Sequence, residues 1–298
     1  NYYYEYVWSW GQGFKYCFTK TKRNGHDIKM VNRISKLFDH LKKKKMSGLG
    51  IFITAGDPNL ETSQEIFNSL PDYGADFIEL GMPFSDPMAD GPAIQASSLR
   101  ALNQGMNLKK TLLMVKNFRN KNLKTPVILM GYYNPIYQYG IENFIKDSKY
   151  FGVDGFIVVD MPPEEDKEFL SYLYNTNMDL IKLLTPTTNE ERLKIVLENS
   201  SGFLYYVSVT GITGTKKATI EEIDISLKKI NKFTKLPIAV GFGISSQKQI
   251  KEISRIANAS VVGSHIVKII ENELIANKNN ALINEKVLKE VKILSLGL

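Results

Sequence analysis

The chain has 298 residues, 43% of them hydrophobic, which suits one large domain with a substantial core. No apolar run approaches the ~18 residues of a transmembrane helix, and the single cysteine, Cys17, excludes an internal disulfide and a cysteine metal cluster. The net charge of +7 arises in residues 1–50, which hold 11 basic and 3 acidic residues; the remainder holds 27 and 28, so no large basic face for nucleic acid is expected there.

The first 28 residues differ in pattern from the rest of the chain. They are rich in Tyr, Trp and Phe, lack helical periodicity and strand alternation, and are poor in the Ser and Arg of transit peptides. We therefore expect 1–28 to be a poorly structured extension and 29–298 to be one domain. Apolar residues at helical spacing between Ile34 and Leu41 predict a first helix, and the run Lys42–Lys45 its solvated end.

Eight short apolar runs follow, each succeeded by a loop and an amphipathic stretch. The runs are Leu49–Thr54, Phe77–Leu80, Val127–Met130, Gly155–Val159, Leu180–Leu184, Phe203–Val207, Ile238–Val240 and Ser260–Val262. Strands that alternate with helices indicate right-handed βαβ units and a parallel sheet. Eight such units predict an α/β fold closed into a (β/α)8 TIM barrel, with a doubly wound open sheet as the alternative.

Polar residues at the starts of the helical stretches are predicted caps. Asp57, before Pro58, is placed to cap the helix after the first strand. Thr188 or Asn189 should cap the helix after the fifth strand. Ser245 or Ser246 should do so after the seventh.

Glycines cluster at the carboxyl ends of three late strands, in Gly211–Gly214, Gly241–Gly243 and Gly263–Ser264. In a barrel these ends share one face, where active sites lie and where phosphate often binds after the last two strands. Glycine lets the backbone approach a ligand, and the start of a helix near Ser264 supplies N–H donors. Each glycine could simply form a tight turn, but three turns at one corner favour a phosphate site.

Glu79 is the strongest single candidate for chemistry. It stands in the apolar run Phe77–Leu80, and strand alternation places it on the face of Phe77. A carboxyl that faces a barrel interior loses hydration, which raises its pKa and suits it to general acid/base catalysis. The alternatives are an outward Glu in a helix contact and a buried Glu with a structural partner.

Asp86 and Asp90 lie in a Pro-, Gly- and Ser-rich loop where aspartate commonly forms turns, and spacing does not choose between them. Tyrosines stand near the barrel mouth at 132, 133, 205 and 206, where a hydroxyl could order a carboxylate. Phe52, Met130 and Phe242 could supply apolar walls for a flat ring, although such residues also fill ordinary barrel cores.

Lys182 is a rival candidate because a lysine inside a barrel strand could form a Schiff base with a carbonyl substrate. The favoured interpretation is that Lys182 points outward with its ammonium group in water. His265 has no His, Cys or spaced carboxylate partner in the sequence, so it does not predict a metal site.

Several of these segments resemble the tryptophan synthase alpha chain family, in family order over roughly residues 30–290. They are Phe52–Pro58, Glu79–Pro92 (ELGMPFSDPMADGP), Tyr132–Pro135, Asp160–Pro162, Ser208–Gly214, Gly241–Ser245 and Gly263–Ser264.

The resemblance implies a set of site residues. Glu79 and Asp90 match the catalytic pair, and Tyr205 matches the tyrosine beside them. Together with the positions singled out above, the predicted substrate-binding residues are Phe52, Met130, Tyr132, Thr213 and Phe242. The predicted phosphate-binding residues are Gly214, Gly243, Gly263 and Ser264, with His265 standing where a small residue is common.

The resemblance also implies an activity and a partner. The expected reaction is the retro-aldol cleavage of indole-3-glycerol phosphate to indole and D-glyceraldehyde 3-phosphate, with no metal, Schiff base or redox cofactor in this chain. The expected partner is a pyridoxal-phosphate (PLP) beta chain in an α2β2 heterotetramer, which receives indole and exchanges allosteric signals with the loops of this chain, above all the PFSDP–ADG loop. Loops 84–92 and 210–220 are expected to close, which would position the substrate and exclude water. The composition suits the cytoplasm or the plastid stroma. A Schiff-base aldolase that uses Lys182 and a non-catalytic regulatory barrel remain the alternatives.

Overall fold

The computed structural model describes residues 32–210, 216–241 and 243–298, which belong to one compact unit of the chain. The predicted extension, residues 1–28, lies outside the described residues. Within the described ranges, no helix is both long and apolar enough to cross a membrane.

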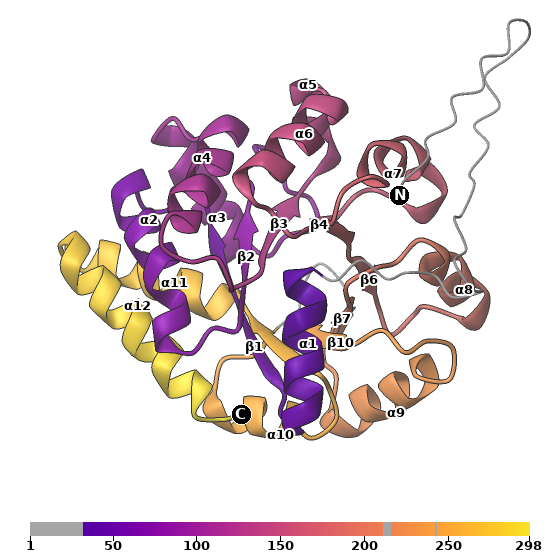
Figure 1. Cartoon of the computed structure of the whole chain (residues 1–298). Coiled ribbons are helices and arrows are strands. Elements are labelled where there is room, and N and C mark those ends of the chain that lie inside the picture. The colour runs from indigo at the N-terminus through magenta and orange to yellow at the C-terminus, as the bar shows by residue number, and fades with distance from the viewer. Residues whose placement is uncertain (1–31, 211–215, 242) are drawn as a thin grey trace, which may run out of the picture. The chain divides into compact units, whose positions relative to one another are not determined.

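One parallel sheet forms the centre of the described fold, inside a ring of helices (Figure 1). Its strand order is β5-β4-β3-β2-β1-β11-β10-β7-β6. The strands are β1 Gly48–Thr54, β2 Phe77–Gly81, β3 Val127–Gly131, β4 Gly155–Val158, β5 Asp179–Leu180, β6 Lys182–Leu184, β7 Leu204–Val207, β10 Ile238–Gly241 and β11 Ala259–Val262. A separate antiparallel pair joins β8 Val209–Thr210 to β9 Lys216–Lys217.

The two ends of this strand order are consecutive in the chain. β5 pairs with β4 and β6 pairs with β7, and only Ile181 lies between β5 and β6. The sheet therefore closes on itself, and the predicted (β/α)8 barrel is confirmed over the doubly wound alternative. All eight predicted runs are strands; the fifth is split in two at Ile181.

Helices follow the strands around the barrel. They are α1 Arg33–Lys44, α2 Leu60–Ser69, α3 Pro92–Asn103, α4 Leu108–Arg119, α5 Tyr133–Tyr139, α6 Ile141–Phe151, α7 Lys167–Leu173, α8 Glu190–Glu198, α9 Ile220–Ile230, α10 Gln247–Ile253, α11 Ser264–Ile275 and α12 Asn280–Ser295, with short 3-10 helices at Leu70–Tyr73 (η1) and Pro163–Glu165 (η2). The predicted caps Asn189 and Ser246 accept hydrogen bonds from the first turns of α8 and α10.

The predicted capping role of Asp57 is wrong. Asn59 caps α2, because its side chain accepts the hydrogen bond from the Thr62 N–H. The carboxylate of Asp57 is buried and accepts two hydrogen bonds from Arg100 of α3, at 2.7 and 2.9 Å. A partner 43 residues away therefore determines the orientation of this side chain.

Strand alternation separates two apolar layers. Side chains such as Phe77, Ile128 and Ile181 form the barrel interior, whereas their neighbours, such as Ile78 and Leu129, pack against the helices. Both layers bury apolar surface, and each Å² removed from water stabilises the folded state by roughly 25 cal/mol. Burial in the two layers therefore favours the closed barrel.

One end of the barrel is closed by α1. Its buried residues Ile34, Phe38 and Leu41 join the interior cluster, and the Phe38 ring lies 6.3 Å from that of Phe77 and 5.4 Å from that of Phe203. Both partners stand at the beginnings of strands, so α1 seals the amino-terminal end of the barrel. The carboxyl ends of the strands form the other end.

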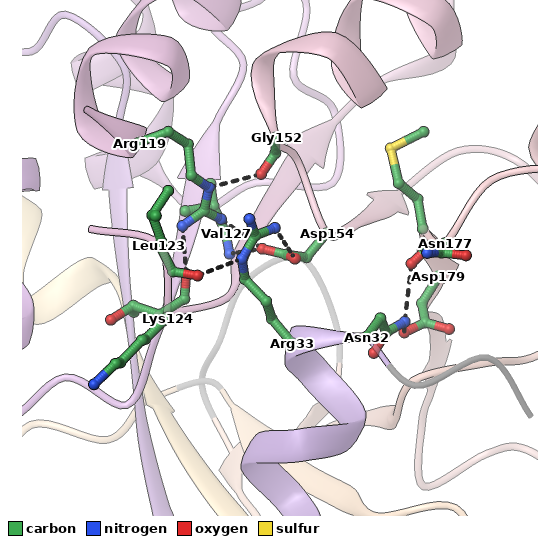
Figure 2. Close-up of polar contacts among 12 residues, drawn as sticks. Asn32, Arg33, Arg119, Leu123, Lys124, Val127, Gly152, Asp154, Asn177 and Asp179 are labelled. Carbon is green, nitrogen blue, oxygen red and sulfur yellow. Dashed lines mark hydrogen bonds and ion pairs between the residues drawn. The ribbon is translucent and has the colours of Figure 1, made fainter. Parts of the chain in front are cut away.

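Figure 2 shows the polar contacts that fix the start of α1. Arg33 donates to Asp154 at 2.9 Å, and Arg119 of α4 donates to the same carboxylate at 2.6 Å. Asn32, the cap of α1, also donates to Asp179 at 2.6 Å. Helix α1 is thus tied to segments that lead into β4 and β5, and the amino-terminal end of the barrel is closed by both apolar and charged contacts.

Candidate active site

A pocket lies among the carboxyl ends of the strands and encloses about 450 Å³ of space not filled by atoms, partly open to solvent. It is lined by Phe52, Glu79, Asp90, Gly91, Ile94, Met130, Tyr205, Gly243, Gly263 and Ser264. Eight of these ten were predicted as site residues. Tyr132 lines an adjoining hollow that shares Phe52, Asp90 and Met130 with the pocket. The predicted residues Thr213, Gly214 and Phe242 lie outside the described residues.

Glu79 of β2 faces this pocket from the barrel interior. Its neighbours Ile78 and Leu80 belong to the layer beneath the helices, so alternation turns Glu79 inward as predicted. The residue has no exposed surface, and among the described residues neither carboxyl oxygen has a hydrogen-bond partner. Burial therefore raises the pKa of Glu79 to about 8.

Asp90 approaches from the loop between β2 and α3. The hydroxyl of Tyr132 donates to its carboxylate at 3.1 Å and accepts a hydrogen bond from the Ala89 N–H at 3.0 Å. Burial raises the pKa of Asp90 to about 6, against the lowering effect of the Tyr132 hydroxyl. Asp86, the alternative from the same loop, is exposed and does not line the pocket. Two carboxyl groups in different surroundings therefore border one pocket.

Tyr205 of β7 fills the interior beside Glu79, and both burial and the charge of Glu79 raise the pKa of its phenol. Gly241 of β10 makes this position possible, because a Cβ there would lie 2.0 Å from the Tyr205 hydroxyl. Gly81 does the same for the ring of Phe52, which an added Cβ would approach to 2.6 Å. Glycines on neighbouring strands therefore create the space for the aromatic walls.

Backbone groups form the side of the pocket beside Gly243, Gly263 and Ser264. Gly243 has a φ of +73°, a conformation that favours glycine. Ser264 opens α11 after Gly263, and the first intrahelical bond is donated by the Val267 N–H. The N–H groups of the first three helical residues are thus free of intrahelical acceptors, and the first turn carries no acidic side chain. This arrangement suits an anion such as phosphate.

Gly91 and Ile94, at the start of α3, are the lining residues that sequence analysis missed. Gly91 is the cap of α3, followed by Pro92 in its first turn, and Ile94 is buried one turn later. The glycine–proline pair marks the helix start. Ile94 could not be predicted from the sequence pattern, because the pattern does not show that α3 begins at the edge of the pocket.

Lys182 of β6 points away from the pocket, as predicted, but its ammonium group is not in water. It donates to Asp166 at 2.7 Å, and its side chain is only 7% exposed. The prediction missed this ion pair because Asp166 lies in the segment before α7, outside the strand pattern. No cluster of three or more His, Cys, Asp or Glu side chains fit for a metal occurs in the described part of the chain.

The sequence model of one protein family, tryptophan synthase alpha chain, matches residues 38–294. The chain belongs to the tryptophan synthase alpha chain family. Tryptophan synthase subunit alpha from Legionella pneumophila str. Paris is 34% identical, with a TM-score of 0.82 over 90% of this chain and 98% of that one.

Two further solved structures are similar to this chain. One from Aquifex aeolicus VF5 is 35% identical, with a TM-score of 0.81 over 90% of this chain and 99% of that one. Tryptophan synthase from M. tuberculosis, in an aminoacrylate-bound form, is 26% identical, with a TM-score of 0.78 over the same shares.

Membership in the tryptophan synthase alpha chain family makes the chain a carbon–carbon lyase of tryptophan biosynthesis. It cleaves indole-3-glycerol phosphate to indole and D-glyceraldehyde 3-phosphate. The pocket is lined by apolar and aromatic side chains and, at Gly263 and Ser264, by the start of α11.

Proposed function

We propose that this pocket performs the cleavage with Glu79 as the general acid and base and Asp90 as the partner of the indole ring N–H. The observation that carries the proposal is the fully buried carboxyl of Glu79, which faces the pocket and has no partner among the described residues. A structural glutamate in a barrel interior would be paired, because an unpaired buried carboxylate is costly.

The first step protonates the indole ring. Protonated Glu79 gives its proton to C3, the C2–C3 double bond supplies the electron pair, and positive charge develops at the ring N–H. The carboxylate of Asp90 accepts a hydrogen bond from that N–H and stabilises the charge. A positioned acid of this kind contributes roughly 10²–10⁴-fold.

The second step breaks the carbon–carbon bond. The carboxylate of Glu79 takes the proton of the glycerol hydroxyl next to the ring, the aldehyde forms, and the bonding electrons return to the ring. Indole leaves with the proton that Glu79 gave, and Glu79 regains one from the hydroxyl. The cycle therefore needs no net proton and no further reactant.

The remaining site residues position the substrate in this proposal. Phe52, Met130 and Ile94 supply apolar surface for the ring, and Tyr205 packs beside Glu79. The start of α11 and Gly243 receive the phosphate. By resemblance to the family, Gly214 joins the phosphate site, and Thr213 and Phe242 contact the substrate.

We also propose a beta-chain partner that carries PLP, in an α2β2 assembly, with indole passed between the chains. The loop that carries Asp90 supports this proposal, since its Met88 is 74% exposed although it is apolar. Tyr137 on α5 is 60% exposed. A partner that covers Met88 would contact the loop two residues from Asp90, which suits a role in loop closure and allosteric control.

The Schiff-base alternative has little support. Lys182 is held by Asp166 among the outer side chains, and the pocket lining does not include it. The retained pair of carboxyl groups also argues against a purely regulatory barrel.

The test is indole release from indole-3-glycerol phosphate by wild-type protein and by Glu79→Gln, each with and without a beta chain. We expect indole from the wild type, faster with the partner, and a rate lowered by at least ~10²-fold in Glu79→Gln. Lys182→Arg is the matched control, because it keeps a cation beside the buried Asp166 but cannot form a Schiff base. Normal turnover by Glu79→Gln, or a covalent adduct at Lys182 after borohydride treatment, would refute the proposed mechanism.

A further inference from the structure

His265 stands in the first turn of α11, immediately after Ser264 of the pocket. Its side chain leaves the pocket and reaches α12, where Nε2 lies 2.9 Å from Oε1 of Glu290. Both side chains are partly buried, at 28% and 23% exposure. A hydrogen bond therefore joins the helix that opens at the phosphate end of the pocket to a helix 25 residues later.

The first turn of α11 lacks the side-chain cap that the helices before and after it in the chain have. The caps of α10 and α12, Ser246 and Asn279, accept hydrogen bonds from the first turns of their helices. Gly263 has no side chain to do so, and no side-chain cap bond is present in α11. Such a cap would occupy the N–H groups that face the pocket, so its absence leaves them available to an anion but leaves the turn without a local tie.

The hydrogen bond with Glu290 restrains this turn from a different helix. Helix α12 is firmly anchored, because Ile283, Val287 and Val291 on it are completely buried. Glu290 extends from this fixed element and holds the imidazole of the second residue of α11. The contact restrains the direction of the N–H groups without occupying any of them.

We propose that His265 is a positioning residue for the substrate phosphate. Through its hydrogen bond to Glu290 it holds the first turn of α11 in the orientation that receives the phosphate, and it thereby sets phosphate affinity without touching the bond that is cleaved. This inference rests on the proposed phosphate site. A second observation beside the helix terminus marks the same pocket as a ligand site, namely the unpartnered, fully buried carboxyl of Glu79.

Calorimetry with inorganic phosphate, and separately with indole, tests the proposal on the full chain. We expect His265→Ala and Glu290→Ala each to weaken phosphate binding by roughly three- to tenfold, the effect of one lost orienting hydrogen bond. The double variant should be no weaker than the worse single variant, because both changes remove the same contact. Glu290→Gln keeps an acceptor for the imidazole and should retain most of the affinity.

Indole binding and kcat should stay at wild-type values in His265→Ala, while KM for indole-3-glycerol phosphate rises with the phosphate Kd. His40→Ala is the matched control, since it removes an exposed imidazole from α1 at the opposite end of the barrel. If His265→Ala does not fold, Glu290→Ala removes the same bond from the other side.

Two results would overturn the inference while leaving the proposed function intact. One is unchanged phosphate affinity in both alanine variants, and the other is an equal loss of phosphate and indole binding, which would indicate general disruption. Wild-type protein that binds no phosphate would instead refute the proposed phosphate site, and this inference with it.

Discussion

The two carboxyl groups of the pocket differ in their surroundings, and this difference supports the roles proposed for them. Burial alone acts on Glu79 and raises its pKa to about 8, whereas burial raises the pKa of Asp90 only to about 6, because the hydroxyl of Tyr132 opposes the shift. Between these values Glu79 is protonated and Asp90 is ionised, as the proposed first step requires. One site therefore contains an acid and an anion at neutral pH.

This assignment predicts a bell-shaped dependence of kcat/KM on pH. Activity should rise as Asp90 ionises near pH 6 and fall as Glu79 loses its proton near pH 8. Tyr132→Phe removes the hydrogen bond that lowers the pKa of Asp90, so the acidic limb should move to higher pH while the alkaline limb stays. Steady-state rates between pH 5 and 9 measure both limbs, with Tyr133→Phe as the control. An acidic limb that does not move in Tyr132→Phe would show that Asp90 does not set it.

At the scale of elements, sequence predicts what depends on local pattern. Parallel strands buried on both faces are continuous apolar runs, and for this reason all eight were found. The orientation of Asp57 depends on Arg100, and that of Lys182 on Asp166, so the sequence pattern could not specify either contact. Strand alternation correctly turned Glu79 inward, but the absence of a partner for its carboxyl depends on every element around the pocket.

The attachment of α1 gives a prediction about one such tertiary contact. Asp154 is 3% exposed and pairs with Arg119, which is 8% exposed, and with the more exposed Arg33. Asp154→Asn leaves the buried Arg119 without its countercharge and should lower the free energy of unfolding by about 3 kcal/mol or more. Arg33→Ala should cost only about 1 kcal/mol, because that group is partly solvated. Urea unfolding measures both, and Asp224→Asn, at an exposed pair on α9, should change little. Equal losses in Asp154→Asn and Arg33→Ala would mean that burial of Arg119 is not the dominant cost.

For the whole molecule, closure of the barrel brings the residues of the pocket together, and it also lowers the stability of the folded state by burying Glu79. The pocket is formed by residues from β1, β2, β3, β7 and the start of α11. These elements meet because the sheet closes between β5 and β6. The sequence indicated this closure only through the number of predicted strands. Closure also places Glu79 where its charged form is poorly solvated. Glu79, the proposed general acid, therefore reduces the stability of the barrel that positions it.

The pH dependence of folding should report this cost. The pKa of Glu79 is raised from 4.5 to about 8 on folding, so the folded state holds a proton that the unfolded state loses above about pH 4.5. Its contribution to stability is complete below that pH and is lost as pH rises to about 8. Glu79→Gln has no proton to lose, so its free energy of unfolding relative to the wild type should increase by about 2–4 kcal/mol between pH 5 and pH 8. Urea unfolding of both proteins at the two pH values measures the change, with Glu198→Gln as an exposed control on α8. If the difference in free energy of unfolding between the two proteins stays constant with pH, Glu79 is solvated or paired in solution. Another group would then have to be the general acid.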